Sequence, residues 1–250
     1  MKEIRDIINA FPAISLQEAN QVGLMNRTDT KFYFHRRLLT VILTSMLSDF
    51  SVLEIAGERI MPYESSYFDT ADFQMFRWHH NGKLNRYKLR ERKYFLTDES
   101  YLEVKFKSNK GKTEKYRRLQ NGDDVKDREF VMNESPFDMA AMSRVLNNQF
   151  DRMMLVHKSA ALRVSIDMNI RFDNGNHSTY HIDNLVVLEM KADQYNGNMD
   201  LVRKLKLLKI YPSKFSKYVT GMMLFYRELK SNNFKKRYRQ INKVLEKKIL

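Results

Sequence analysis

Polar and apolar residues alternate along several central stretches of the chain, and a period of two predicts β-strands. We expect strands over 27–35, 51–56, 64–69, 84–95, 100–107, 113–119, 162–172 and 180–192. The segments LTDES and KSNKG between three of these stretches supply hairpin turns. The centre of the chain therefore predicts an antiparallel sheet.

Apolar residues at helical spacing lie mainly toward the two ends of the chain. We expect helices over 3–24 with a break at Pro12, over 37–48, 136–149, 198–209 and 213–229, and a turn or short helix over 73–80. Asn198 and Ser213 are the expected N-caps. The pattern predicts the α+β class, with an antiparallel sheet or a barrel of about eight strands flanked by helices.

No linker, repeat or low-complexity run divides the chain. We expect residues 1–229 to form a single domain that includes N-terminal helices within 1–26. Residues 230–250 then form a basic helical tail, which carries eight Lys and Arg and one Glu.

Basic residues occupy one face of most predicted strands. In NRYKLRERKY the alternating positions are Arg86, Lys88, Arg90 and Arg92, which lie on the same side of a strand. The same parity joins Arg27, Asp29 and Lys31; Glu103, Lys105 and Lys107; Lys115 and Arg117; Arg163, Asp167 and Arg171; and Glu189 and Lys191. The carboxylates on these faces are isolated among the cations.

Two interpretations of these faces remain open from the residues alone. In one, the basic face is the wet side of a half-buried sheet, which is the usual arrangement in antiparallel proteins. In the other, the sheet closes and the cations point into a lumen that becomes stable when it holds a polyanion. A wet face normally mixes charges of both signs, and six basic strands in one chain favour the lumen. Lys and Arg would bind phosphate there, and the carboxylates would hold Mn²⁺ or Mg²⁺.

Composition limits the classes of function. The 250 residues carry a net charge of +14, which predicts polyanionic partners. The absence of cysteine excludes disulfides and thiolate catalysis and agrees with a cytoplasmic location. The first residues, MKEIRDIINAF, contain no apolar h-region, so we do not expect a secretory signal. The sequence also shows no membrane-length apolar segment, no phosphate-binding glycine loop and no Ser-His-Asp set. We expect the histidine pairs His79-His80 and His177/His181 to be structural or exposed.

Seven elements in order resemble the VTC domain, the polyphosphate polymerase domain of the triphosphate tunnel metalloenzymes in the CYTH-like superfamily. They are RTDTKF, YFDT, KLRERKY, LEVKFK with TEKYRR, LRVSID, VVLEMK and PSKFSKYVTG. The resemblance covers about residues 20–229 and implies an antiparallel tunnel barrel with a charged lumen. One departure is that Arg27-x-Asp29-x-Lys31 stands where many superfamily members have a Glu-x-Glu-x-Lys element.

The resemblance also assigns residues. It implies that the catalytic set comprises Lys31, Arg90, Arg92, Lys105, Lys115, Arg163, Glu189 and Lys217. Glu189 is the implied metal ligand, with Glu103 as a second acidic candidate, and the cofactor is Mn²⁺ or Mg²⁺. Inward parity adds further candidate substrate-binding residues, Arg86, Lys88, Arg117 and Arg171, and Lys214 is a further candidate of the same kind.

The implied reaction transfers the ATP γ-phosphoryl group to an inorganic polyphosphate chain and releases ADP. Positioned cations and one metal suffice for phosphoryl transfer, so no dedicated general base is required. Two alternatives use the same cations: hydrolysis of triphosphate or a nucleotide, and non-catalytic sensing of polyphosphate or inositol polyphosphate. Nucleic acid is not the expected partner, and we expect the tail to be a solvated helix packed on the body. Binding of the tail to RNA, an acidic membrane or emerging polyphosphate, and a membrane-associated partner, stay open.

Overall fold

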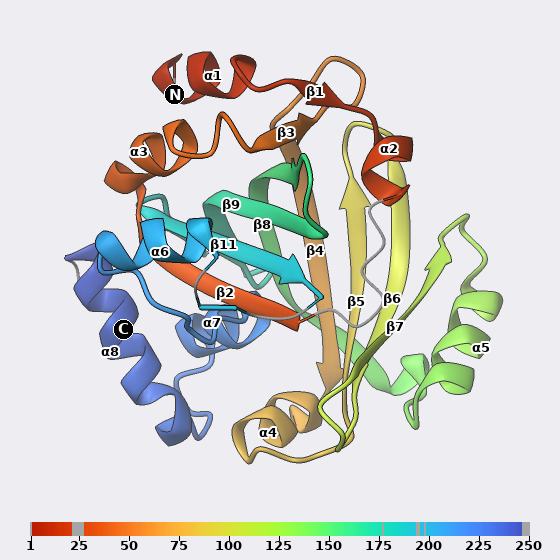
Figure 1. Ribbon diagram of the computed structural model, residues 1–250. Helices are drawn as coiled ribbons and strands as arrows, with labels where there is room; N and C mark the ends of the chain where they lie inside the picture. The colour runs from red at the N-terminus through yellow and green to blue at the C-terminus, as the bar shows by residue number, and fades with distance from the viewer. Residues whose placement is uncertain (1, 22–27, 177, 194–195, 198, 247–250) are drawn as a thin grey trace.

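The computed structural model describes residues 2–21, 28–176, 178–193, 196–197 and 199–246. Several expectations lie outside these residues. They concern Arg27, the end of the first helical region from Val22, His177, the Asn198 cap and the last residues of the tail, 247–250. Within the described residues, one large antiparallel sheet is flanked by helices (Figure 1).

Eight long strands form the continuous path of the sheet, in the order β2-β11-β9-β8-β4-β5-β6-β7. Their bounds are β2 Thr28–His35, β4 Met61–Thr70, β5 Arg86–Tyr94, β6 Glu99–Lys107, β7 Thr113–Leu119, β8 Met142–His157, β9 Leu162–Asp173 and β11 Leu185–Ala192. The short strands β1 Ala13–Ile14, β3 Phe50–Leu53 and β10 Thr179–Ile182 pair outside this path. The predicted α+β class and antiparallel sheet are confirmed.

The sheet is strongly curved but does not close into a hydrogen-bonded barrel. In the described part of the chain, β2 and β7 stand at opposite ends of the strand order and do not pair. The segment before the last helices partly covers the β2 edge, because the Ser213 amide donates a 2.7 Å hydrogen bond to the Lys31 carbonyl. The expectation of a closed barrel is corrected to an open antiparallel sheet, in which eight strands form the continuous path.

Helices cover the outer side of the sheet in two groups. The first group buries apolar side chains of β2, β8, β9 and β11 beneath α1 Lys2–Asn9, α3 Leu39–Thr44 and α6 Asp200–Leu207. The second packs α4 Gln74–His80 and α5 Asp124–Glu134 against the outer side of β5 and β6. The short helices η1 Arg36–Leu38 and η2 Met139–Ala141 precede α3 and β8. The expected short helix over 73–80 is confirmed as α4.

A third apolar cluster lies on the inner side of the sheet. It joins aromatic side chains of β4 and β8 to α2 Leu16–Gln21, α7 Lys217–Phe225 and α8 Asn232–Leu245. In α8, Phe234, Tyr238, Ile241 and Leu245 are buried against the body. The expected packing of a terminal helix on the body is confirmed for the described part of the tail. Among the described residues, no helix combines the length and apolar content needed to cross a membrane.

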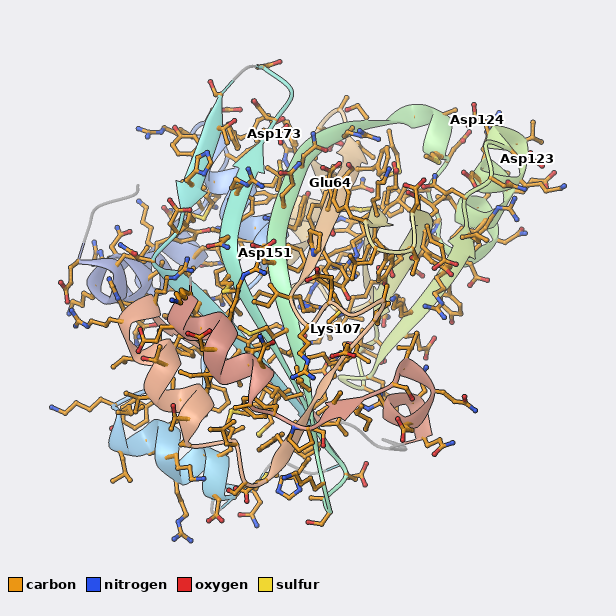
Figure 2. The ribbon with its side chains drawn as sticks, turned by 90° about the horizontal axis from the view of Figure 1, so that it is seen from above. Glu64, Lys107, Asp123, Asp124, Asp151 and Asp173 are labelled. Atoms are coloured by element: carbon orange, nitrogen blue, oxygen red, sulfur yellow. The ribbon has the colours of Figure 1, made fainter. Side chains whose placement is uncertain are left out.

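Two predictions of secondary structure are wrong, and one helix was not predicted. The stretch 136–149, expected to be helical, begins the sixteen-residue strand β8. Helix α5 was not predicted, because its apolar residues do not share one face: Val125 and Met132 are exposed while Val131 is buried. Its N-cap is Asp123, which lies with Asp124 at the periphery of the molecule (Figure 2). The single strand expected over 180–192 is two strands, β10 and β11.

A bulge in β9 exchanges the two faces of that strand. Asn169 has φ 52°, in the left-handed region that Asn tolerates better than most residues. Its side-chain amide donates a 2.6 Å hydrogen bond to Asp151 of β8 (Figure 2). Before the bulge, Ile166 and Met168 pack under the outer helices; after it, Ile170 and Phe172 belong to the inner cluster. Beyond Asn169 the assignment of β9 side chains to the inner and outer faces is therefore shifted by one residue.

Candidate functional site

The inner side of the sheet brings together cations from at least six strands, β2 and β5 to β9, and from one helix. Strand register fixes most of them: Arg90 lies opposite Glu103, Lys105 opposite Lys115, and Glu189 opposite Lys31. Residues directly opposite in an antiparallel pair project to the same face, so these side chains share the inner side. Helix α7 contributes Lys217 at its first position.

Glu103 is the centre of one cluster on β5, β6 and β7. Its side chain is 1% exposed. One oxygen accepts hydrogen bonds from Arg90, at 2.7 Å from Nε and 2.5 Å from Nη2, and the other lies against the Lys115 ammonium group. Burial alone would raise the pKa of Glu103, but Arg90, Arg92 and Lys115 hold it at about 2. Both oxygens are engaged by cations, so we assign Glu103 to positioning Arg90 and Lys115.

Asp167 is the centre of a second cluster on β8, β9 and α7. Arg152 binds it through two hydrogen bonds, from Nε at 2.6 Å and Nη2 at 2.8 Å, and Lys217 contacts the second oxygen. Burial opposes ionisation of Asp167, yet Arg152 and Lys217 keep its pKa well below the usual range. Burial lowers the pKa of Lys217 to about 8 despite the attraction of Asp167. This carboxylate fixes two cations in place.

Three cations between these clusters have no direct ion pair among the described residues: Lys88, Arg92 and Lys105. Lys88 donates a 3.0 Å hydrogen bond to the Ser216 hydroxyl, and Arg92 donates one of 3.3 Å to Ser65. Burial and the neighbouring Lys31 and Arg90 lower the pKa of Lys105 to about 8. Burial, together with Lys105 and Arg86, holds the pKa of Lys88 well below its ordinary value. For both lysines burial is the largest cause of the lowered pKa, and neighbouring cations lower it further.

Glu189 lies beside this unpaired set. Its carboxylate contacts the Lys31 ammonium group, and although burial opposes it, Lys31 and Lys191 hold the pKa of Glu189 well below the usual range. No group of three or more metal-ligating His, Asp or Glu side chains occurs in the described part of the chain. One ionised carboxylate fits a Mg²⁺ or Mn²⁺ ion whose other ligands are phosphate oxygens and water. It does not fit a metal held by protein alone.

The remaining predicted residues lie at the margins of this cluster or outside it. Arg163 shares the inner face of β9 and lies opposite Lys191. Arg117 lies opposite Glu103 and is exposed, while Arg86 and Lys214 lie near Lys107. Arg171 is the exception: beyond the β9 bulge it pairs with Gln149 and His181 and is exposed on the outer side. Its expected inward parity is wrong.

Sequence reasoning missed Arg152 and the role of Asp167. Arg152 lies directly opposite Asp167 across β8 and β9, and its side chain is 12% exposed. The signal was present in FDRMMLVH, where Phe150, Arg152 and Met154 alternate with other residues. The helical interpretation of the preceding stretch concealed it. The N-cap of α7 is Ser216, whose hydroxyl accepts a hydrogen bond from the Val219 amide and another from Lys88. The prediction of Ser213 as this cap was wrong.

Comparison with known protein families identifies the fold. The family model of the VTC domain matches residues 26–226. The chain belongs to the VTC domain family. Among curated protein sequences, none is significantly similar to this VTC domain.

Several solved structures align over most of the VTC domain at low sequence identity. A candidate adenylate cyclase from Bacillus halodurans aligns with TM-score 0.52 at 10% identity, covering 81% of this chain and all of its own. A Pyrococcus horikoshii protein aligns with TM-score 0.43 at 13% identity, covering 79% of this chain and 98% of its own. A Hippeastrum adenylyl cyclase candidate with a dominant triphosphatase activity has TM-score 0.43, 15% identity and coverages of 79% and 95%. The first of these shows that the VTC domain shares the fold of the B. halodurans protein.

Proposed function

We propose that this VTC domain is a polyphosphate polymerase that transfers the γ-phosphoryl group of ATP to an inorganic polyphosphate chain. The observation that carries the proposal is the excess of inner cations over carboxylates. Four cations are held by Glu103 and Asp167, whereas Lys88, Arg92 and Lys105 have no direct ion pair in the described part of the chain. A bound phosphate chain would supply the anionic charge that they lack.

The two kinds of cation suit two tasks in phosphoryl transfer. Guanidinium groups anchored by carboxylates, such as Arg90 and Arg152, keep a fixed orientation, which favours in-line alignment of donor and acceptor. Lys88 and Lys105 would neutralise charge that develops on the transferred group. Because phosphoryl transfer depends mainly on positioning and electrostatics, the lack of an evident general base is consistent with this reaction.

Glu189 would hold the divalent metal together with phosphate oxygens. A divalent metal held by Glu189 would supply positive charge that offsets the negative charge of the phosphates. Lys31 contacts the same carboxylate and would keep it ionised and oriented. Asp29 lies two positions before Lys31 on the same face of β2, where it adds a further acidic side chain.

The test is incubation of the purified protein with ATP and Mn²⁺ or Mg²⁺, with product analysis by gel electrophoresis and by phosphate and ADP assays. Long-chain phosphate with ADP supports the proposal, and Glu189→Gln should abolish both products while the protein stays folded. Orthophosphate without chains would instead identify a hydrolase. Thermal stabilisation by polyphosphate without turnover would identify a sensor. Either of these two results would overturn the polymerase proposal.

A further inference from the structure

The inner side of the sheet has two chemically different ends. Strand β5 runs from one to the other, because Arg86 is its first residue and Tyr94 its last. We call the first the lysine end, defined by Arg86, Lys107 and Lys214, and the second the tyrosine end, defined by Tyr63, Tyr94, Tyr101 and Phe150. In Figure 1 the β5 end near α4 is the lysine end, and the opposite end near α2 is the tyrosine end.

The four rings of the tyrosine end form a continuous series. Tyr63 stacks on Phe150 with centroids 5.5 Å apart and planes at 10°. Tyr94 meets Tyr63 edge to face at 5.1 Å, and Tyr101 meets Tyr94 edge to face at 5.7 Å. Tyr63 and Phe150 are buried, whereas Tyr94 and Tyr101 are partly exposed. The series therefore connects the interior with solvent and leaves aromatic surface available at its outer part.

This aromatic surface lies next to the phosphate-binding cations. Tyr101 is directly opposite Arg92 in the sheet, and Tyr94 follows Arg92 by two residues on the same face. Two residues of strand span about 7 Å. The Arg117 guanidinium lies 5.0 Å from the centre of the Tyr101 ring, so a cation and an aromatic face stand together there. A ligand with phosphates on Arg92 would bring an attached group to Tyr94 and Tyr101.

The turns at the two ends carry opposite charge. At the tyrosine end, the β5–β6 turn contains Asp98 and leads into Glu99. At the lysine end, the β6–β7 turn contains Lys110 and Lys112 and follows Lys107, which is exposed (Figure 2). Asp98 is ion-paired with Lys93 at 3.0 Å, so the acidic excess at this turn is the single carboxylate of Glu99. A long phosphate chain is therefore favoured at the lysine end and disfavoured beside Glu99. An uncharged aromatic group meets no such penalty at the tyrosine end and gains stacking surface.

We propose that the tyrosine end is a nucleobase subsite and that the phosphate chain extends from the central cations toward the lysine end. This inference rests on the proposed function, because it assigns a place to the base of the donor nucleotide. It gives the site a direction: the base lies at Tyr94 and Tyr101, the triphosphate at Arg92, Lys105 and Lys88, and the acceptor chain beyond them. Stacking on tyrosine and arginine is tolerant of base identity, so the subsite accepts purines with little discrimination.

The experiment compares binding of ATP with binding of inorganic tripolyphosphate, measured by titration calorimetry in EDTA, where the proposed metal-dependent reaction does not proceed. Tyr101→Ala should weaken ATP binding about tenfold and leave tripolyphosphate binding unchanged, since base stacking has that value in alanine substitutions. Tyr101→Phe keeps the ring and should keep ATP affinity. Tyr211→Ala, at a tyrosine that is 57% exposed and far along the chain between α6 and α7, is the matched control.

The outcomes separate this inference from the proposed function. Equal weakening of ATP and tripolyphosphate by Tyr101→Ala, or no weakening of ATP, overturns the nucleobase subsite while the phosphate site stands. If Arg90→Ala leaves tripolyphosphate binding unchanged, the proposed function itself fails. Saturation-transfer NMR gives an independent readout. Transfer to adenine H2 and H8 that disappears in Tyr101→Ala supports the subsite, and transfer that persists unchanged in this variant overturns it.

Discussion

Two groups of cations occupy the same inner surface but stand in opposite electrostatic situations. The first group is paired, with Arg152 and Lys217 on Asp167 and the equivalent pair on Glu103. The second is the unpaired set of Lys88, Arg92 and Lys105. The paired cations are oriented before any ligand arrives, whereas the unpaired cations lose hydration without gaining a direct anionic partner among the described residues. One face of the sheet therefore holds both the paired cations with their carboxylates, which we call the frame, and an unpaired set that can bind an anion.

The same comparison explains how the free protein tolerates the charge. Each buried carboxylate contacts two cations, so the two carboxylates offset about half of the positive charge of these four side chains. The unpaired set keeps some contact with polar or aromatic groups: Lys88 lies 5.5 Å from the Tyr218 ring, and Arg92 lies 5.7 Å from that of Tyr63. Cation–π attraction of about 1 kcal/mol each reduces the cost of burial without removing the need for an anion.

Removal of the central carboxylate of the frame should have the largest effect. Asp167→Asn leaves Arg152 and Lys217 buried without their counter-charge, and we expect a loss of about 3–5 kcal/mol in the free energy of unfolding. Urea denaturation measures it. Asp183→Asn, at an aspartate whose side chain is 65% exposed, should change stability by less than about 0.5 kcal/mol. Equal stability of the two variants would show that Asp167 does not hold the frame.

The unpaired set should respond in the opposite direction. Lys88→Met removes a cation without a counter-ion, so the ligand-free protein should gain about 1 kcal/mol, or about 2–4 °C in Tm. The same change should weaken tripolyphosphate binding about tenfold, because a charge-assisted contact is lost. Thermal melts with and without tripolyphosphate test both effects. A variant that loses stability without ligand would place Lys88 in the frame.

Deprotonation of Lys105 as pH rises offers a third test, with a smaller expected effect. The pKa of Lys105 is about 8, so its positive charge is lost as pH rises through 8, and tripolyphosphate affinity should fall about tenfold between pH 7 and 9. In the unfolded chain the lysine keeps its proton to about pH 10.4. Between pH 8 and 10 the unfolded state therefore binds more protons than the folded state, and the free energy of unfolding of the ligand-free protein should rise with pH. Binding and stability therefore change in opposite directions.

The matched variant for this titration is Lys105→Arg, which keeps the charge and does not titrate in this range. Titration of tripolyphosphate itself affects both proteins equally, so the difference between their pH profiles reports Lys105. Calorimetric titrations at pH 7, 8 and 9 measure it. Parallel profiles would remove Lys105 from the pH-dependent site.

Much of this arrangement could be predicted from the sequence, because strand parity is a local property. The inner positions of Arg90, Glu103 and Lys105 follow from uninterrupted alternation between two hairpin turns. The partners of these residues could not be predicted in the same way. Asp167 lies opposite Arg152 because of the register between the long strands β8 and β9. Strand β8 was not predicted, because its first residues were interpreted as part of a helix.

The remaining failure has a local physical cause. Parity holds along β9 only to the left-handed residue Asn169, whose side chain bonds to Asp151 across the strands. An Asn within a strand is compatible with regular or bulged structure, and its cross-strand partner decides between them. The resemblance to the VTC domain predicted the order of the sequence elements. Arg171, however, was assigned to the inner face from strand parity alone, and the bulge at Asn169 makes that assignment wrong.

Arg171 provides the smallest and most specific prediction. Because it lies beyond the bulge and is exposed opposite Gln149, Arg171→Ala should change tripolyphosphate affinity by less than about twofold and stability by less than about 0.5 kcal/mol. Arg90→Ala, which has the same change in charge on the inner face, should weaken binding by at least tenfold. Calorimetry on the two variants compares the faces directly. If Arg171→Ala weakened binding as strongly as Arg90→Ala, the site would respond to overall charge and not to inward geometry.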